Sequence, residues 1–194
     1  MTNNNRILSG TALTAVLLLN SVPTLAADDV TFFGHRAEGK WMIGAKVAVV
    51  QNGQSGFDDS TNIGLLIGYE FARPIGFDGT ASIEVEGTTS ISDGDIDPDS
   101  IFGASGEWDA DTIALYFAYR TPGTVFFKGK LGVLRSEVTS NVAGVSVEND
   151  DASLSWGVGL GVRLHEKFNA ELEFTDDTGD TDLSLISLGG NLLF

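Results

Sequence analysis

The sequence predicts an all-β fold in which eight antiparallel strands run up and down and close into a barrel. Three observations support this prediction. Apolar residues alternate with other residues in eight separate segments of the 194-residue chain, which is the period of strands with two unlike faces. No long segment holds a helical period, and glycine, with 24 residues, far outnumbers proline, with 4. The connections between the predicted strands alternate between short and long, which is typical of consecutive hairpins in a barrel.

The first segment of the chain, residues 1–26, has the composition of a secretory signal peptide. Arg6 precedes an apolar stretch over residues 7–19, and small residues lead up to Ala26. This stretch is shorter than the ~20 residues with which a helix crosses a bilayer. We therefore expect cleavage after Ala26 and export of the remaining chain.

The remaining chain divides into a lead-in over residues 27–40, expected in the periplasm, and a barrel over residues 41–194. No other segment reaches the ~18 apolar residues of a membrane-spanning helix. The 27 acidic and 11 basic side chains give a formal net charge of -16, which argues against nucleic acid as a partner. Cysteine is absent, and this excludes disulfides and thiolate metal sites.

Eight apolar rows define the strands in chain order. Their members are Trp41, Ile43, Ala45, Val47 and Val49; Ile63, Leu65, Ile67, Tyr69 and Phe71; Ala81, Ile83 and Val85; Ile113, Leu115, Phe117 and Tyr119; Val125, Phe127, Leu131 and Val133; Ala152, Leu154, Trp156, Val158, Leu160, Val162 and Leu164; Phe168, Ala170, Leu172 and Phe174; and Ile186, Leu188, Leu192 and Phe194. The third row is the shortest. A soluble sandwich would turn these rows toward a core and a membrane barrel would turn them toward lipid, so alternation alone leaves both readings open.

The rows that lie opposite the apolar ones carry charges of both signs, and this favours a transmembrane barrel. If the apolar rows face lipid, the lumen receives five basic and five acidic side chains: Lys46, Arg120, Lys128, Lys130 and Arg163, with Glu70, Glu84, Glu86, Glu171 and Glu173. Charges in a narrow lumen must be paired and hydrogen-bonded, whereas a solvated sheet face needs no such balance. The sequence therefore predicts an ion-pair network in the lumen. Three alternate glycines, Gly157, Gly159 and Gly161, are expected to leave room for Lys128 and Lys130.

The connections predict which end of the barrel faces which side of the membrane. The turns "ARPIGFDG", "TPGT" and "HEK" are short and are assigned to the periplasm, together with both termini. On the other side lie "QNGQSGFDDST", "SISDGDIDPDSIFGASGEWDAD", residues 136–151 and "TDDTGDTD", which are mostly longer and rich in aspartate. Short periplasmic turns with long external loops are typical of barrels in the bacterial outer membrane.

One of the long connections, "EVTSNVAGVSVEND", continues the alternation past the expected membrane boundary. We predict that it forms a hairpin with its turn near Ala143–Gly144 and that this hairpin projects above the membrane. An exposed strand edge is a template for a partner strand. Adhesion or docking and a passive protrusion both agree with this pattern.

The aromatic residues of the apolar rows gather near one end of the predicted strands. A lower aromatic girdle at the membrane interface, where rings meet both lipid and water, is predicted to comprise Trp41, Phe71, Tyr119, Phe127, Phe168 and Phe194. Trp156 and Phe174 are expected near the upper interface.

The C-terminal stretch resembles the assembly signal of bacterial outer-membrane barrels, with Ser187, Gly189, Leu192 and Phe194 in the places of that signal. Gly190 departs from the apolar residue usual at its place. From residue 41 to 194 the chain resembles the small eight-stranded outer-membrane barrels, which include the OmpA transmembrane domain, OmpX and the opacity-type, porin-like proteins. The segments "YRTPGTVFFKGKLGVL", "SWGVGLGVRL" and "FNAELEF" carry this resemblance.

The resemblance implies a monomer in the outer membrane of a Gram-negative bacterium, in contact with lipid and lipopolysaccharide and inserted by the outer-membrane assembly machinery. It does not imply an activity, because this fold carries several unrelated functions. Lipid-A-modifying enzymes of this architecture use a histidine near the outer leaflet. Here His35 precedes the first strand and His165 lies in a predicted periplasmic turn, so we expect no enzyme activity.

The run "DGDIDPD" offers alternate carboxylates that could approach a calcium ion, at Asp93, Asp95, Asp97 and Asp99. Pro98 stands where a calcium loop needs glycine, and no glutamate closes the loop. A solvated acidic loop is the preferred interpretation, and we expect no metal or other cofactor.

The sequence thus predicts a non-enzymatic integral outer-membrane barrel that serves envelope structure, surface interaction with a host or other cell surface through acidic external loops, or both. Three alternatives remain: a lipid-A-modifying enzyme, a narrow and weakly conducting porin-like barrel, and a secreted soluble β-protein. An eight-stranded barrel has an interior filled by side chains, with Met42, Leu66, Tyr116, Phe126 and Leu134 expected there beside the charges.

Overall fold

A computed structural model of the chain describes residues 30–32, 35–72, 78–99, 103–179 and 182–194. The predicted signal peptide lies outside the described residues. The strands are β1 (Val30–Phe32), β2 (His35–Ala37), β3 (Gly39–Asn52), β4 (Ser60–Phe71), β5 (Thr80–Ser92), β6 (Gly94–Ile96), β7 (Gly106–Arg120), β8 (Val125–Val142), β9 (Val145–His165), β10 (Phe168–Asp177) and β11 (Leu183–Leu193). Among the described residues, the search for a helix long and apolar enough to cross a membrane finds none.

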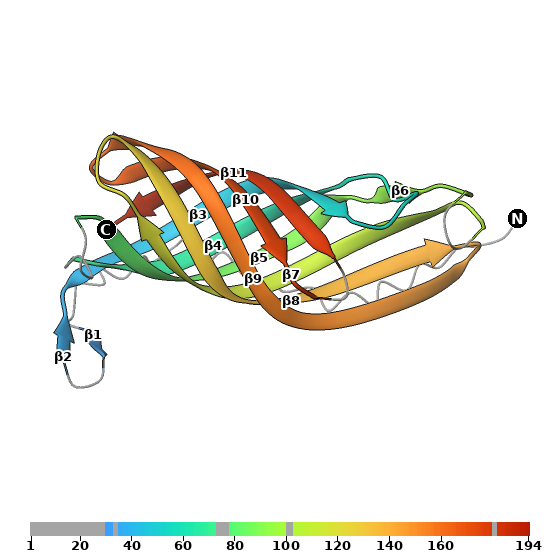
Figure 1. Ribbon diagram of the computed structural model, residues 1–194, viewed down its shortest axis with the longest axis horizontal. Helices are drawn as coiled ribbons and strands as arrows, with labels where there is room; N and C mark the ends of the chain where they lie inside the picture. Colours follow the sequence, from blue (N-terminus) through green and yellow to red (C-terminus); the bar gives the residue numbers. More distant parts are fainter. Residues whose placement is uncertain (1–29, 33–34, 73–77, 100–102, 180–181) are drawn as a thin grey trace, which may run out of the picture.

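The long strands form a closed antiparallel barrel. One sheet of nine strands has the order β5-β4-β3-β11-β10-β9-β8-β7-β6, and a further pairing between β5 and β7 closes it. Because β6 has only three residues, eight of the described strands make up the barrel wall, as the sequence predicted. Strands β1 and β2 pair with each other in a separate hairpin beside the barrel (Figure 1).

The barrel has two unlike ends. We call one the short-turn end, because it carries the turns at residues 121–124 and 166–167 and the C-terminal Phe194. We call the other the hairpin end, because it carries the turn between β8 and β9. In Figure 1 the C-terminus lies at the left, and the β8–β9 hairpin extends far to the right.

The β8–β9 hairpin confirms the predicted hairpin and its turn, whereas its projection above a membrane stays a prediction. Strand β8 has 18 residues and β9 has 21, against 10 to 15 in the other barrel strands. Its turn residues, Ala143 and Gly144, both have positive φ, of 51° and 82°. Two consecutive positive φ values match the twist of the flanking strands in a two-residue hairpin turn.

The connection expected over residues 90–111 is wrong in part, because strands occupy much of it. Strand β5 runs to Ser92, β6 follows at once, and β7 already begins at Gly106. The alternation continues there with its faces exchanged, so that Trp108 is buried while Glu107 is exposed. A search for outward apolar rows therefore passes over these strand segments.

The side chains alternate around the wall as the sequence predicted. The apolar rows point outward, and members such as Ile67, Leu131 and Leu188 are 58%, 62% and 64% exposed. The opposite rows point into the lumen and are buried along most of the barrel. A barrel of this kind satisfies its backbone hydrogen bonds between strands, which is the requirement for crossing lipid.

Candidate functional site

The lumen holds a buried layer of charged side chains near the short-turn end. We call it the charged tier. It consists of Lys46 on β3, Glu84 and Glu86 on β5, Arg120 on β7, Lys128 and Lys130 on β8, and Glu171 and Glu173 on β10. The tier has four cations and four carboxylates, so its formal charge is zero.

Arg120 and Lys128 lie at the centre of the charged tier. The Nη1 of Arg120 donates to Glu84 Oε1 at 2.6 Å, and its Nε donates to Glu171 Oε1 at 2.8 Å. The Nζ of Lys128 donates to Glu84 Oε2 at 2.8 Å and to Glu173 Oε1 at 2.5 Å. Each charge therefore has more than one partner, as buried ions need in order to offset their desolvation.

The rest of the charged tier continues toward the hairpin end. Lys46 donates to Glu86, and Lys130 Nζ donates to both Glu86 oxygens at 3.0 and 2.9 Å. Glu173 Oε2 lies 2.9 Å from Lys130 Nζ, although the angles are not those of a hydrogen bond. Lys130 Nζ also lies 4.3 Å from the centre of the Tyr116 ring, in a cation–π contact.

Glycines of β9 provide the space for the long side chains of the tier. A Cβ at Gly157 would lie 2.7 Å from Lys130 Cε, and a Cβ at Gly159 would lie 3.5 Å from Lys128 Cβ. The expectation agrees for Lys130 beside Gly157, whereas Gly159 makes room mainly for Glu173, whose Cγ would lie 3.1 Å from the added Cβ. Gly161 differs, because a Cβ there would meet the ring of Phe126 rather than a lysine.

Two of the charged residues expected in the network lie outside it. Glu70 accepts a hydrogen bond from Thr80 Oγ1 at 3.3 Å. Arg163 donates to the carbonyl oxygens of Gly123 and, at 3.2 Å, Thr121, and its guanidinium lies 4.5 Å from the Phe126 ring. Both lie close to the short-turn end, where turn carbonyls and hydroxyls are in reach. Arg163 therefore holds a turn in place instead of pairing in the lumen.

Packing leaves little free space beside the charged tier. A cavity between Lys46, Glu86, Glu173 and the β11 residues Ser187 and Asn191 has room for about one water molecule. Met42, Leu66, Tyr116, Phe126 and Leu134 are buried in the lumen, as expected, with Phe126 on the short-turn side of Lys128 and Leu134 on the hairpin side of Lys130. The Tyr116 hydroxyl lies 2.9 Å from Ser155 Oγ, and the polar groups near the middle of the barrel are thus also paired.

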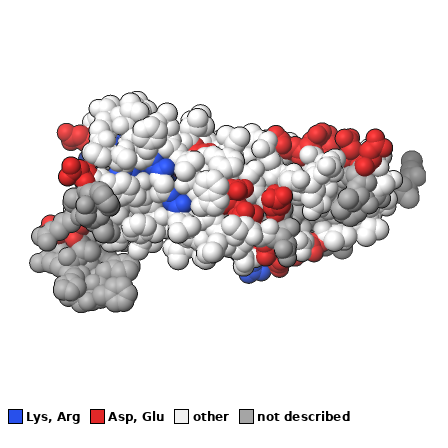
Figure 2. Space-filling view, in the orientation of Figure 1, with Lys and Arg blue, Asp and Glu red and all other residues white. Residues whose placement is uncertain are grey.

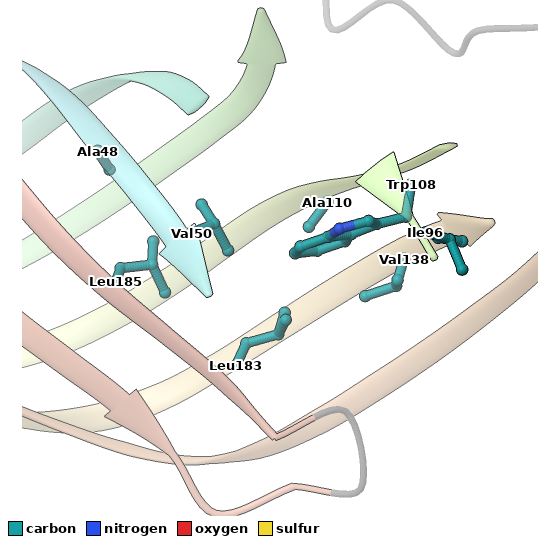
Figure 3. Packing of buried hydrophobic residues seen from close by; sticks show 8 residues of the cluster. All are labelled: Ala48, Val50, Ile96, Trp108, Ala110, Val138, Leu183 and Leu185. Carbon is teal, nitrogen blue, oxygen red and sulfur yellow. The ribbon is translucent and has the colours of Figure 1, made fainter. Parts of the chain in front are cut away.

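An apolar cluster fills the lumen toward the hairpin end, and we call it the apolar plug. It consists of Ala48, Val50, Ile96, Trp108, Ala110, Val138, Leu183 and Leu185 (Figure 3). Trp108 is fully buried, and its Nε1 donates to the carbonyl oxygen of Asp58 at 2.7 Å. The Phe57 ring meets the Trp108 ring edge-on, with centroids 5.9 Å apart.

The connection between β3 and β4 is tied to β6 over the apolar plug. The amide of Asp58 donates to the Asp95 carbonyl at 2.8 Å, and the amide of Asp97 donates to the Gly56 carbonyl at 2.8 Å. Phe57 pairs with Ile96 in an isolated bridge. The plug was missed from the sequence because residues 90–111 were interpreted as a solvated loop. The alternate apolar residues of that segment, such as Trp108 and Ala110, could have indicated the plug.

Carboxylates line the outer face of β6–β9 beside the plug, and we call this the acidic face. Cross-strand pairs place Asp95 opposite Glu107, Asp111 opposite Glu137, and Glu137 opposite Asp150. Figure 2 shows the red acidic side chains gathered toward the hairpin end, on the right. Arg135 on the same face lies 3.3 Å from Asp150 and is largely exposed.

Asp109 lies on the acidic face, on the part of β7 that continues beyond the lipid-facing row. Burial, together with the nearby carboxylates of Asp93, Asp111 and Glu137, raises the pKa of Asp109 from its ordinary 3.8 to about 6. Burial disfavours the charged form of a carboxyl group, and like charges add to this effect. Like charges therefore repel one another around Asp109 at neutral pH.

The structure places the predicted girdle residues at the short-turn end of the wall. Phe127, Phe168 and Phe194 are exposed, and Trp41, Phe71 and Tyr119 are partly exposed. Tyr69, which the sequence interpretation left out of the girdle, lies edge-on between Trp41 and Phe71, with ring centroids 5.3 and 5.5 Å away. The position of Tyr69 in the outward apolar row could have indicated that it belongs to the girdle. Trp156 and Phe174 also meet edge-on, at 5.8 Å.

The four residues of the proposed assembly signal lie on both faces of the closing strand. Ser187 points inward and is buried, Gly189 lies against Lys46, and Leu192 and Phe194 point outward. The backbone of Phe194 exchanges two hydrogen bonds of 3.0 Å with Trp41 of the first barrel strand. The ring of Phe168 covers Gly190, since a Cβ there would lie 3.0 Å from the ring. The Phe168 ring thus occupies the space that a larger side chain at residue 190 would fill.

The remaining candidate residues for chemistry lie apart from one another. Asp93, Asp95, Asp97 and Asp99 are all exposed. A search of the described residues for three or more acidic, histidine or cysteine side chains that could hold one metal ion finds no such group. His165 Nδ1 accepts a hydrogen bond of 3.3 Å from the Lys167 amide at the short-turn end.

Comparison with protein families gives one match over nearly the whole chain. Residues 12–191 match the family described as outer membrane protein beta-barrel domain. A search of curated proteins gives no match.

Several solved structures share the fold at low sequence identity. The outer membrane protein OprG from Pseudomonas aeruginosa has a TM-score of 0.61 at 16% identity, over 81% of this chain and 97% of that one. Ail, the attachment invasion locus protein of Yersinia pestis, has a TM-score of 0.54 at 17% identity, over 82% of this chain and 100% of that one. The N-terminal β-barrel domain of Pseudomonas aeruginosa OprF has a TM-score of 0.54 at 14% identity, over 80% and 99%. Ail has also been solved in complex with the heparin analogue sucrose octasulfate.

Proposed function

Because the chain belongs to the outer membrane protein beta-barrel domain family, we propose that it is a non-enzymatic integral protein of a Gram-negative outer membrane that contacts partners outside the cell. The single observation that carries this proposal is the exchange of faces along the strands. Around the charged tier the outer face is apolar, as lipid requires, whereas on the side of the apolar plug formed by β6–β8 the outer face is acidic, as suits water. The wall is thus built to lie in lipid over one part of its length and to stand in water over the other.

The same exchange supports an orientation. The hairpin end, with its acidic face, would lie outside the cell, and the short-turn end, with both termini, would lie in the periplasm. Short periplasmic turns and longer external extensions are the usual arrangement of these barrels. Contacts with lipid and lipopolysaccharide, insertion by the assembly machinery through Ser187, Gly189, Leu192 and Phe194, and a monomeric state belong to the same proposal.

The hairpin end is the part that offers an interaction surface. In the β8–β9 hairpin, β8 pairs with β7 as far as Val142, and residues 143–150 beyond it are all exposed. Ail is named for attachment and has been solved with a sulfated ligand, but its likeness to this chain is one of fold. The acidic face here would repel a sulfated polyanion, so the chemistry of this surface favours a cationic partner.

The packed lumen argues against the porin-like alternative. Three layers fill the described lumen: paired charges, buried aromatic and aliphatic side chains, and the apolar plug. The space beside the charged tier holds about one water. For the lipid-A-modifying alternative, His165 lies at the wrong end of the barrel, and a serine without a neighbouring base is not an activated nucleophile.

A shortened hairpin tests the proposed surface role. Replacing residues 141–146 by an Asn-Gly turn joins Ser140 to its partner Val147, a cross-strand pair of the same type as the Val142–Val145 pair that flanks the present turn, and it removes only the pairing of residues 141–142 with residues 106–107 of β7. The matched control replaces only Ala143–Gly144 by Asn-Gly. We expect both variants to fractionate with outer membranes and to show heat-modifiable migration. Only the shortened variant should lose binding of the expressing cells to host or neighbouring cell surfaces.

The location and orientation are tested with an epitope inserted between Ala143 and Gly144. We expect antibody to label this epitope on intact cells, and to label an epitope inserted between Glu166 and Lys167, in the exposed turn at the short-turn end, only after the outer membrane is opened. Protein in the aqueous fraction without detergent would contradict the membrane location. Labelling of the epitope between Glu166 and Lys167 on intact cells would contradict the orientation.

A further inference from the structure

We propose that the free edge of β9 at the hairpin end binds an extended peptide segment of alternating aliphatic and basic residues, which adds to the sheet as a further strand. This inference rests on the proposed function, because it requires the hairpin end to face the outside. It adds to that function the kind of partner and the way in which the partner is held.

The first step is the edge itself. Along Val145–Asp150, the backbone of β9 pairs with β8, and the pairing with β10 begins only at Ser155. Among the described residues, the last backbone hydrogen bond on the β10 side is donated by the Thr178 amide to the Leu154 carbonyl at 2.9 Å, and Ser153 Oγ donates to Asp177 Oδ2 at 3.2 Å. Within the described residues, no strand pairs with the other side of Val145–Asp150. Such an edge presents backbone donors and acceptors to an incoming strand.

The second step is the unlike character of the two faces beside this edge. On the face that continues the lumen row, Val145 and Val147 are 63% and 53% exposed, and Val142 lies directly opposite Val145. On the outer face, Glu148 and Asp150 continue the acidic face. An aliphatic surface and an acidic surface thus meet along the same free edge of β9.

These two faces define the partner. Side chains of an added strand alternate between the faces of the sheet and pair with their cross-strand neighbours. Aliphatic residues on the inner face would cover Val145 and Val147, while Lys or Arg on the outer face would lie beside Glu148 and Asp150. The long-range field agrees, because the chain has a net charge of -16 and attracts a basic segment.

A second copy of the chain does not fit this edge. If two β9 edges paired with each other, the outer face of one copy would continue the outer face of the other. Glu148 and Asp150 of both copies would then stand side by side, and like charges that face each other across strands are destabilising. Inward and outward charges on an edge are a common means of preventing self-pairing.

Binding of a synthetic strand to the refolded full chain in detergent micelles tests the proposal directly. The probe is a fluorescein-labelled peptide of about nine residues in which Val and Lys alternate. The controls are a peptide of the same composition with Val and Lys in two blocks, an alternating Val and Glu peptide, and the alternating Val and Lys peptide with N-methylated backbone amides. We expect binding of the unmodified alternating Val and Lys peptide, and binding weaker by about tenfold or more for each control.

A pair of charge reversals locates the site. Glu148→Lys with Asp150→Lys should weaken binding of the Val and Lys peptide by about tenfold or more. The matched control, Asp95→Lys with Glu107→Lys, makes the same change of charge on β6 and β7, away from the edge, and should change binding by less than about twofold. Heat-modifiable migration checks that each variant is folded.

The outcomes separate this inference from the proposed function. Equal loss in both charge-reversal variants, or equal binding of the block peptide, would mean general electrostatic attraction and would overturn strand addition. Binding unaffected by N-methylation would overturn it as well. If the shortened hairpin abolishes binding to cells while the peptide fails to bind β9, the surface role stands and the inference about the edge falls.

Discussion

The charged tier and the apolar plug lie in one lumen, yet they follow opposite rules. In the charged tier the interior is ionic and the exterior apolar, and where β6–β8 enclose the plug the interior is apolar and the exterior acidic. The difference teaches that the surroundings of the wall select its two faces. Where lipid lies outside, the charges have only the lumen and must pair there. Where water lies outside, the wall folds like that of a soluble barrel.

A single strand shows the change from one rule to the other. On β8, Lys128 and Lys130 point inward while Leu131 points outward, and a few residues later Val138 is buried while Glu137 is exposed. The backbone alternation itself continues without a break from Val125 to Val142. The period of two is therefore constant, and only the chemistry of the two faces is exchanged.

The largest expected effect comes from removing a cation of the charged tier. Arg120→Met leaves Glu84 and Glu171 short of a partner in a buried place, which should lower the free energy of unfolding by about 3–5 kcal/mol. The control is Arg135→Met, because Arg135 pairs with Asp150 on the exposed face and its loss should cost less than about 1 kcal/mol. Urea unfolding from lipid vesicles, followed by tryptophan fluorescence, measures both. An equal loss of unfolding free energy in the two variants would contradict a larger contribution from the buried charges of the tier.

A charge placed on the outer face at two heights tests the exchange of rules directly. Leu131→Arg puts a guanidinium in the lipid-facing row and should cost about 2–4 kcal/mol. Thr139→Arg lies on the same face of the same strand, opposite Asp109 and Glu148, and should be neutral or stabilising by about 0.5 kcal/mol. The same unfolding assay applies. A penalty at Thr139 as large as at Leu131 would place lipid around the acidic face.

A methyl group added to a glycine probes the packing of the lumen. Gly161→Ala brings a Cβ into the Phe126 ring, and such overpacking should cost about 1–3 kcal/mol. Gly129 on the outward row has nothing within 4 Å of an added Cβ, so Gly129→Ala should change stability by less than about 0.5 kcal/mol. If both variants are equally stable in urea unfolding, the interior near the short-turn end is loose rather than packed.

The smallest effect belongs to the acidic face. The pKa of Asp109 is raised from 3.8 to about 6, so the folded state binds its proton more tightly than the unfolded state does. Stability from this group is present at low pH and is lost as the pH rises from about 3.8 to about 6. Asp109→Asn removes the repulsion and should stabilise the fold by about 0.5–1 kcal/mol at neutral pH.

The pH dependence of the stabilisation by Asp109→Asn tests this prediction. Thermal unfolding of the variant and the unchanged chain should differ most above pH 6 and converge toward pH 4. A difference that grows as the pH falls would contradict the assignment of the repulsion to Asp109.

Much of the wall and of the charged tier follows from the sequence. Alternation alone places Ile67 and Leu188 outward, and the hairpin turn follows from residues 136–151, whose alternation is interrupted at Ala143–Gly144. The balance of signs brings Lys128 and Glu84 into the same interior. These predictions succeed because a period of two is a local property of the chain, and because charge in a low-dielectric lumen must be neutralised.

Other features depend on distances that the sequence does not contain. Arg163 belongs by period to the lumen, yet its height on the wall brings it to the carbonyls of residues 121–124. The apolar plug assembles residues from β3, β6, β7, β8 and β11, and its members look like loop residues until the wall brings them together. The cover of Gly190 by Phe168 is likewise a matter of register between two strands.

The sequence by itself determined that the strands alternate, that eight of them form the wall, and which side chains share a face. Only the tertiary structure decided at which height each side chain stands, and therefore which charges pair, where the apolar plug begins and which described stretch of β9 has a paired strand on one side only. The physical reason is that alternation is fixed by the backbone of each strand, whereas height is fixed by the stagger of strands around a closed barrel.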